Sequence, residues 1–180
     1  VEAWIRENIK EKARCFITNV SSAYSMLNLQ GPNARALLSN VSSTDFSNSS
    51  FPFGTMQRIE IGYQNAWALR ISYTGELGWE LYIPTEMTLG IYDRLLEEGK
   101  NFGLTHCGYH ALNSLRIEKA YREWAHDMGP TDTLKECGLA FTCDWNKTEG
   151  FIGQEALEGQ TPPLSRRLVQ FVLEDPEPIL

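Results

Sequence analysis

The sequence lacks the motifs of several large enzyme classes. It holds neither G-x-G-x-x-G nor G-x-x-x-x-G-K-[ST], the glycine-rich patterns that cradle a dinucleotide or a triphosphate. It also holds no G-x-S-x-G, the strand-to-helix turn that presents the serine of many Ser/His/Asp hydrolases. The motifs therefore favour neither nucleotide-dependent nor serine-dependent chemistry.

Basic charge and long apolar runs are also scarce. The chain has 16 Lys and Arg against 23 Asp and Glu, which gives a net charge of −7 at pH 7. Because neutralising phosphates requires a basic surface, we expect no nucleic-acid partner. No apolar run approaches the roughly 20 residues that span a bilayer, so we expect no membrane partner.

Cysteine is sparse, and no C-x-x-C pair occurs. The four cysteines are scattered along the chain: Cys15, Cys107, Cys137 and Cys143. This spacing suits reduced thiols in an intracellular compartment better than a disulfide framework.

What remains is an ordinary globular composition over 180 residues, 42% of them hydrophobic. This size predicts one compact domain over residues 1–180. Strands joined mostly by hairpins and interspersed with packing helices predict an α+β fold with a mixed or antiparallel sheet. Both ends look cut, because 168–173 reads as a strand and 174–180 stops as though more chain followed. We therefore expect a piece of a longer protein.

Hydrophobic periodicity gives the expected elements. Helices are expected over 1–13, 33–41, 85–99, 108–125 and 154–157. Strands are expected over 15–20, 23–30, 56–63, 66–73, 79–83, 138–143 and 168–173.

Three details of this pattern matter below. The strands 56–63 and 66–73 should pair around Gln64-Asn65 and form a meander with 79–83. The helix 108–125 is apolar nearly all round and should be central. Its charged residues Arg116 and Glu118 would then need partners.

The most informative stretch runs from Arg70 to Pro84. An extended run breaks at 74–78, which contains two glycines three residues apart, and a strand resumes at 79–83. In that second strand Glu80 and Tyr82 share one face. The other face is wholly apolar (Trp79, Leu81, Ile83) and must enter a core. The first strand carries Trp67, Leu69 and Ile71 in alternation, as a half-buried strand would.

A carboxylate flanked by aromatic rings suits a flat heterocycle with adjacent N–H donors. The rings stack on the heterocycle and the carboxylate accepts two hydrogen bonds. Glu80, Tyr82 and Tyr73, which sits just across the turn, provide these groups. The same segment also fits an ordinary hairpin with a solvent-facing glutamate, and by itself it leaves both interpretations open.

The remaining polar residues are more simply explained by structure. His106 and His110 could share a metal on a helix, but no second ligand pair accompanies them. Arg116 fits an internal ion-pair anchor, and Asp132 and Asp144 fit solvated loops. The sequence therefore offers no catalytic residue and no metal site of its own.

The residues also carry a family resemblance. The segment Tyr73–Tyr82, Y-T-G-E-L-G-W-E-L-Y, resembles the signature of the folate-binding aminomethyltransferase family, which includes the glycine-cleavage T-protein. Its E-L-G-W-E-L form is similar to the version in sarcosine and dimethylglycine dehydrogenases. Further matching segments follow in the family's order: 29–32, 51–54, 113–119, 136–139, 151–157 and 166–169.

The resemblance implies the tetrahydrofolate-binding part of a large flavoenzyme. An N-terminal half, outside this chain and carrying FAD, would oxidise the N-methyl group of sarcosine or dimethylglycine to an imine. The folate-binding half would capture the one-carbon unit as 5,10-methylenetetrahydrofolate. By the motif match, Glu80 accepts the pterin's paired N–H donors, and Tyr73, Leu81 and Tyr82 line the folate.

The implied partners are folate and a small methylated amine. The implied location is the mitochondrial matrix in a eukaryote and the cytoplasm otherwise. The family's catalytic aspartate belongs to a motif expected upstream of Val1, and its final β-barrel is expected beyond this chain. The T-protein's folate-binding arginine corresponds to Leu112, and a folate-contacting tyrosine of dimethylglycine dehydrogenase corresponds to Phe141.

Two rival interpretations stay open. One is a regulatory relative, such as the pyruvate dehydrogenase phosphatase regulatory subunit, that acts as an interaction module. The other is a free-standing aminomethyltransferase or folate-dependent demethylase. The isolated chain is expected to have no dehydrogenase activity.

Overall fold

The computed structural model describes residues 1–175 and divides the chain into two compact units, Val1–Leu112 and Asn113 onward. Each unit is described by itself. Residues 176–180, which belong to the tail expected to continue into more chain, lie outside the described residues. The expectation of a single folate-binding domain over the whole chain stays a prediction.

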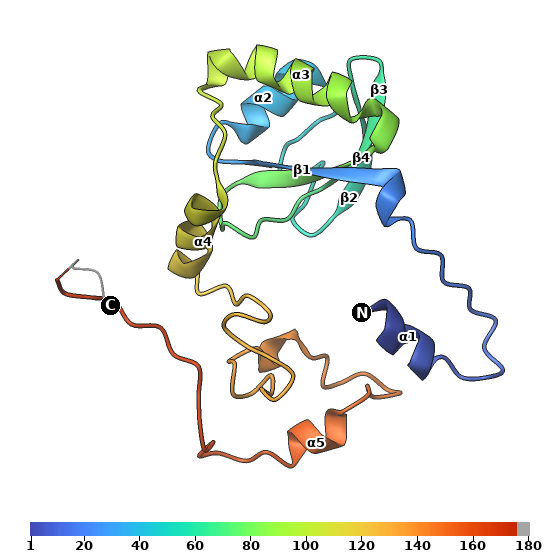
Figure 1. The fold of residues 1–180 in the computed structure, drawn as a ribbon, viewed down its shortest axis with the longest axis vertical. Helices are drawn as coiled ribbons and strands as arrows, with labels where there is room; N and C mark the ends of the chain where they lie inside the picture. The colour runs from blue at the N-terminus through green and yellow to red at the C-terminus, as the bar shows by residue number, and fades with distance from the viewer. Residues whose placement is uncertain (176–180) are drawn as a thin grey trace. The chain divides into compact units, whose positions relative to one another are not determined.

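The first unit is built on a four-stranded antiparallel sheet (Figure 1). Its strands are β1 (Tyr24–Gln30), β2 (Met56–Ile61), β3 (Gln64–Leu69) and β4 (Gly78–Pro84), in the spatial order β1-β4-β3-β2. The meander predicted for the last three strands is confirmed, and β1 adds to it beside β4. Together with the helices, this sheet confirms the α+β prediction.

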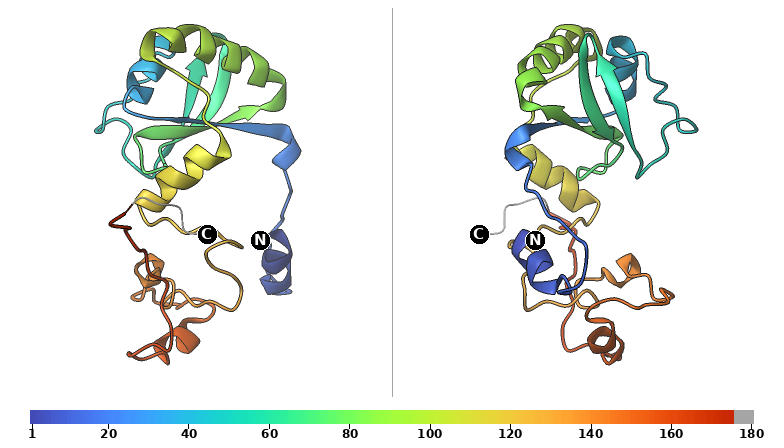
Figure 2. Two further views of the ribbon diagram at one scale, coloured as in Figure 1. Left: turned by 60° about the vertical axis from the view of Figure 1, so that its left-hand side comes forward. Right: turned by 90° about the vertical axis from the view of Figure 1, so that its right-hand side faces the viewer.

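Two helices, α2 (Ala34–Val41) and α3 (Thr88–Gly99), lie on one face of this sheet (Figures 1 and 2). Short 3-10 turns occur at Ser21–Ala23, Thr85–Met87 and Lys100–Phe102. Helix α1 (Glu2–Asn8) contributes no buried residue. Of the described helices, none is long and apolar enough to cross a bilayer.

The core lies between the sheet and α2 and α3. The apolar stripe of α2 is buried as its spacing predicts, at Ala34, Leu37, Leu38 and Val41. From β4, Trp79, Leu81 and Ile83 are each 0% exposed. The Trp79 ring meets the rings of Phe46 and Phe51 edge-on, with centroids 5.3 and 6.0 Å apart. The predicted inward face of β4 is therefore confirmed.

Gly78 allows β1 and β4 to approach closely. A Cβ added at Gly78 would lie 2.1 Å from the Gln30 side-chain oxygen and 2.4 Å from the Leu29 carbonyl oxygen. The second contact involves backbone, which cannot swing away as a side chain can. Glycine at this position is thus a packing requirement at the point where the loop 70–77 enters β4.

The turn between β2 and β3 differs from the prediction. Residue Ile61 pairs with Gln64, so the two-residue loop is Gly62-Tyr63 rather than Gln64-Asn65. Gly62 has a φ of +61°, the conformation that a tight hairpin favours at its first central position. The positive φ requirement, which glycine meets at least cost, therefore sets the register.

The second unit has little regular structure. Helix α4 (Tyr109–Glu118) crosses the boundary at residue 112, and α5 (Gln154–Glu158) confirms the predicted short helix. The predicted helix 108–125 is wrong in length, because the backbone leaves helical geometry after Glu118 and Ala120 takes a φ of +54°. It is also wrong in placement, since Ile117 and Trp124 are 47% and 61% exposed.

Three predicted strands are wrong. Residues 15–20 and 168–173 form no strand, and 138–143 contains a 3-10 turn at Ala140–Thr142. Phe16 and Phe171 are 96% and 82% exposed. Their composition favours extended backbone, but a strand is stabilised only by a hydrogen-bonded neighbour, and the described residues provide none there. The predicted helix 1–13 is likewise shorter, ending at Asn8.

We expect Gly78→Ala to lower the free energy of unfolding of the first unit by about 1–3 kcal/mol, because the added methyl group must push β1 away from β4. Chemical denaturation followed by tryptophan fluorescence measures this. The control is Gly108→Ala in the same unit, where an added Cβ meets no atom within 4 Å. Equal effects of the two substitutions would show that close approach is not the reason for glycine at 78.

Candidate functional site

The candidate site is the face of the sheet opposite the helices. We call it the open face. On β4 it carries Glu80 and Tyr82, both half-buried, while their neighbours in sequence point into the core. In the antiparallel register Glu80 stands between Asn28 of β1 and Leu69 of β3. Pairing thus brings together side chains from three strands.

A second row of the open face is apolar on β1, β4 and β3, and it ends at Arg58 of β2, which stands opposite Trp67. Tyr82 stands between Met26 of β1 and Trp67 of β3. Met26 is 49% exposed and Trp67 is 42% exposed. A carboxylate therefore lies beside an accessible apolar and aromatic surface.

Tyr82 and Glu80 form a direct hydrogen bond. The Tyr82 hydroxyl donates to Glu80 Oε2 over 2.6 Å. This bond, with burial and the negative charge of Glu80 adding to it, raises the pKa of Tyr82 to about 12. Tyr82 thus stays protonated at neutral pH and holds one carboxylate oxygen in place. Among residues 1–175 no other side chain or N–H group is hydrogen-bonded to Glu80, so Oε1 can accept from a ligand.

Tyr73 lies in the segment that joins β3 to β4 and is half-buried. This segment is held by side-chain and backbone hydrogen bonds. The Ser72 and Thr74 hydroxyls are 3.2 Å apart, and the Gly31 N–H donates to the Leu77 carbonyl over 2.8 Å. The position of Tyr73 is therefore defined by the loop that leads into β4.

Leu81 needs a correction. Its side chain is 0% exposed and belongs to the core, and its backbone pairs with Leu27 and Ala68 on the flanking strands. The sheet alternation that brings Glu80 and Tyr82 to the open face necessarily turns Leu81 away. The Leu81 side chain cannot contact a ligand on the open face. It packs in the core on the other side of β4 and anchors the strand that carries Glu80 and Tyr82.

The sequence interpretation missed Trp67. The alternation of Trp67, Leu69 and Ile71 suggested a buried stripe, but the buried residues of β3 are Ala66 and Ala68. Both faces of this strand are apolar, so hydrophobicity cannot choose between them. The usable signal was the pairing of β3 with β4, which places Trp67 on the same face as Tyr82.

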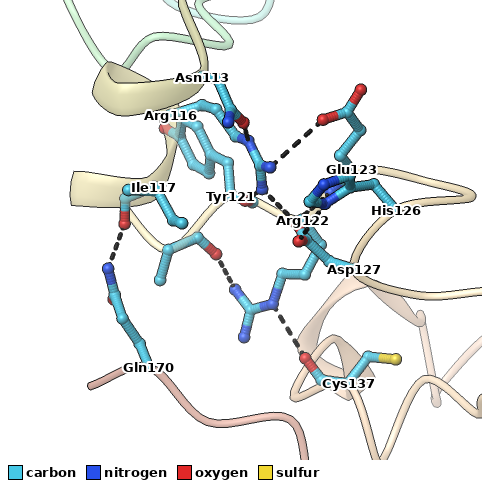
Figure 3. Close-up of polar contacts among 11 residues, drawn as sticks. Asn113, Arg116, Ile117, Tyr121, Arg122, Glu123, His126, Asp127, Cys137 and Gln170 are labelled. Atoms are coloured by element: carbon cyan, nitrogen blue, oxygen red, sulfur yellow. Dashed lines mark hydrogen bonds and ion pairs between the residues drawn. The ribbon is translucent and has the colours of Figure 1, made fainter. Parts of the chain in front are cut away.

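The second unit holds a buried ion cluster around Arg116 (Figure 3). The Arg116 side chain is 1% exposed and contacts the carboxylates of Asp127 and Glu123, the latter over 3.2 Å. It also donates to Asn113 Oδ1 over 2.7 Å and to the Tyr121 carbonyl over 3.0 Å. The predicted need of Arg116 for partners is confirmed, and the cluster ties α4 to the loop that follows it.

The contacts of this cluster change the pKa of Asp127. Burial by itself would raise the pKa of Asp127, but hydrogen bonds from His126, the Glu123 N–H and Arg116 outweigh it and lower the pKa to about 2. The carboxylate is therefore stabilised in its charged form. This contribution to stability is complete above about pH 4 and is lost as the pH falls toward 2.

The other sequence candidates have structural partners. His106 Nε2 lies 2.8 Å from the Tyr92 hydroxyl. Asp132 is not a solvated loop residue, because it pairs with Arg166 over 2.9 Å. Asp144 is exposed and caps a turn by accepting from the Asn146 N–H. Within residues 1–175, no group of three or more His, Cys, Asp or Glu is placed to hold a metal ion.

Comparison with known proteins identifies the family. Residues 1–147 match the GCVT N-terminal domain. The chain belongs to this family. The match confirms the resemblance to aminomethyltransferases that was first indicated by the segment Tyr73–Tyr82. The α+β architecture of this chain is consistent with it.

Individual relatives are larger proteins. This GCVT-domain chain is 42% identical over 94% of its length to human mitochondrial sarcosine dehydrogenase. It is 37% identical over 97% to human mitochondrial dimethylglycine dehydrogenase, and 34% identical over 96% to the mouse mitochondrial pyruvate dehydrogenase phosphatase regulatory subunit. The chain spans only 18% to 21% of the length of these relatives.

Arg116→Met should lower the free energy of unfolding at pH 7 by about 1–3 kcal/mol, because it removes a buried cation from the half-buried carboxylate of Asp127. The difference from wild type should shrink between pH 4 and pH 2, where the Asp127 contribution is lost. Urea titrations at several pH values test both statements.

The control is Arg94→Met. Arg94 pairs with Glu98 over 3.1 Å but is 45% exposed, so its removal should cost no more than about 1 kcal/mol. A pH-independent loss for Arg116→Met, or a loss no larger than that of Arg94→Met, would contradict the structural role.

Proposed function

We propose that this chain is the tetrahydrofolate-binding part of a flavin-dependent N-methyl amine dehydrogenase acting on sarcosine or dimethylglycine. It captures the one-carbon unit as 5,10-methylenetetrahydrofolate. The observation that carries the proposal is Glu80, held by Tyr82 on an open face lined by apolar and aromatic side chains. Similarity to sarcosine and dimethylglycine dehydrogenases supports the choice of substrate class.

The residues of the open face fit a reduced pterin. The pyrimidine edge of a pterin presents adjacent N–H donors, and a carboxylate with an unused oxygen is a suitable acceptor for them. The ring itself is flat and needs an apolar surface, which Met26, Leu69 and Trp67 provide. Bound tetrahydrofolate supplies the nitrogen atoms that accept the one-carbon unit.

The residues of this chain bind and orient. Tyr82 donates to Glu80 Oε2 and so fixes the carboxylate plane before a ligand arrives. Trp79, Leu81 and Ile83 anchor the same strand in the core. Tyr73, in the segment that joins β3 to β4, stays a proposed folate contact. Oxidation of the amine belongs to the proposed FAD-bearing half outside this chain.

Two further elements complete the proposal. The mitochondrial relatives favour the mitochondrial matrix as the location if the protein comes from a eukaryote. If it does not, the proposed location is the cytoplasm. A regulatory interaction module is the second candidate function, favoured by 34% identity over 96% of the chain to a phosphatase regulatory subunit.

Glu80→Gln in the full-length protein should weaken folate binding by about 1.5–3 kcal/mol, roughly tenfold to a hundredfold. The charge-assisted hydrogen bonds are lost, and the amide has a single acceptor oxygen, for which the Tyr82 hydroxyl and the pterin compete. Isothermal titration calorimetry with 5-formyltetrahydrofolate, a stable reduced folate, measures the change.

The matched control is Glu60→Gln, since Glu60 is an exposed glutamate on β2 of the same sheet. Its dissociation constant should equal that of the wild type. If Glu80→Gln also binds with unchanged affinity, Glu80 is not the pterin acceptor.

Folate should redirect the released carbon without changing the speed of amine oxidation. In the full-length enzyme, adding tetrahydrofolate should raise methylenetetrahydrofolate at the expense of formaldehyde, and Glu80→Gln should reverse this. The rate of flavin reduction should barely change, because binding to this domain stabilises nothing in that transition state. Product analysis and stopped-flow absorbance give the two readouts.

The same measurements separate the two candidate functions. A full-length protein that binds no folate, and whose flavin is reduced by neither methylated amine, would support the regulatory module and contradict the enzyme.

A further inference from the structure

Trp67 is an exposed indole in an unusual place. It lies on β3, an inner strand of the sheet, yet 42% of it is accessible to solvent. Among residues 1–175 no aromatic ring packs against it and no cation lies over it, whereas Trp79 on the core side of β4 has both an edge-on aromatic neighbour and a cation over its ring. The face of the Trp67 ring is therefore free to receive a ligand.

The position of Trp67 relative to Glu80 suits one bicyclic ring. Trp67 pairs directly with Tyr82, and Glu80 is the diagonal neighbour two residues earlier on β4. Diagonal side chains of this kind start about 7–8 Å apart, the length of a fused two-ring heterocycle. Leu69, directly opposite Glu80 and two residues after Trp67 on β3, adds an aliphatic side chain to the same face.

The chemistry of the two residues is complementary. Glu80 offers hydrogen-bond acceptors to the edge of a ring, and an indole offers a large rigid surface to its face. Tyr82 cannot replace the indole fully, because its hydroxyl is engaged with Glu80 over 2.6 Å and this orients its ring.

We infer that Trp67 stacks on the pterin whose edge Glu80 binds, which makes it the residue that packs on the face of the ring in the folate site. This inference rests on the proposed folate function. It predicts that the contact is to the pterin rather than to the remainder of the folate molecule.

The test measures dissociation constants in the full-length protein under anaerobic conditions. Two probes are used, 5-formyltetrahydrofolate and 6-methyltetrahydropterin, which lacks the aminobenzoyl-glutamate tail. Trp67→Ala should bind both probes roughly tenfold more weakly, because an aromatic stack and its buried area are lost. Trp67→Phe should recover most of the affinity, since it keeps a ring.

A spectroscopic readout does not depend on how well Trp67→Ala folds. The fluorescence of Trp67, obtained as wild type minus Trp67→Phe, should be quenched when either probe binds. The control is Trp4→Phe, because Trp4 lies on α1 and is 54% exposed. The signal that it removes should not respond to the probes.

The outcomes separate this inference from the proposed function. If Glu80→Gln weakens binding while Trp67→Ala and the Trp67 fluorescence are unaffected, the inference is wrong and the folate function stands. If Trp67→Ala affects only 5-formyltetrahydrofolate, Trp67 contacts the tail and the inference is again wrong. A wild-type protein that binds neither probe overturns both.

Discussion

The alternation of side chains along β4 is the constraint on which the first unit depends. Trp79, Leu81 and Ile83 are completely buried, and each such side chain stabilises the fold by about 1.5–3 kcal/mol relative to an exposed one. A slip of one residue would exchange the two faces and bury Glu80 and Tyr82 instead. The burial that stabilises the sheet therefore also determines that Glu80 and Tyr82 lie on the open face.

This coupling explains which parts could be predicted from the sequence. In β4 one face is wholly apolar and the other carries a carboxylate and a phenol, so only one orientation is stable. The stripe of α2 is equally clear, because Ala34, Leu37, Leu38 and Val41 recur at helical spacing between polar residues. Where polar and apolar residues are segregated so strictly, local sequence and tertiary burial agree.

The missed features lack that segregation. In β3 the sequence Ala66-Trp67-Ala68-Leu69 is apolar on both faces, and the smaller residues are the buried ones. They share the buried core with larger side chains from α2 and α3 and with the stacked Phe46 and Phe51 rings. Which face of β3 turns inward thus depends on pairing with β4, a long-range contact that periodicity does not contain.

The segments predicted as strands outside the sheet show the same limit in another form. Residues 168–173 contain Val169, Phe171 and Val172, all favourable in strands, yet they are 59%, 82% and 90% exposed. Propensity describes what a segment can adopt, while a strand exists only where a neighbour offers hydrogen bonds. For Arg116 the sequence indicated that a buried cation would need partners. It did not identify Asp127 and Glu123 as those partners, because they lie in a loop whose path the sequence pattern does not define.

The hydrogen bond between Tyr82 and Glu80 gives the proposed site its selectivity. With a pKa of about 12, the Tyr82 hydroxyl remains a donor at every physiological pH, so one oxygen of the carboxylate is always occupied. The oxygen that remains can only accept, and it repels ligands that present a carbonyl or a carboxylate at that position. Under the proposed function, this site recognises the pyrimidine edge of a pterin, which is the same in oxidised and reduced folates. Selection of the reduced form must therefore come from contacts to the other ring, which changes from planar to puckered on reduction and which a flat indole at Trp67 would sense directly.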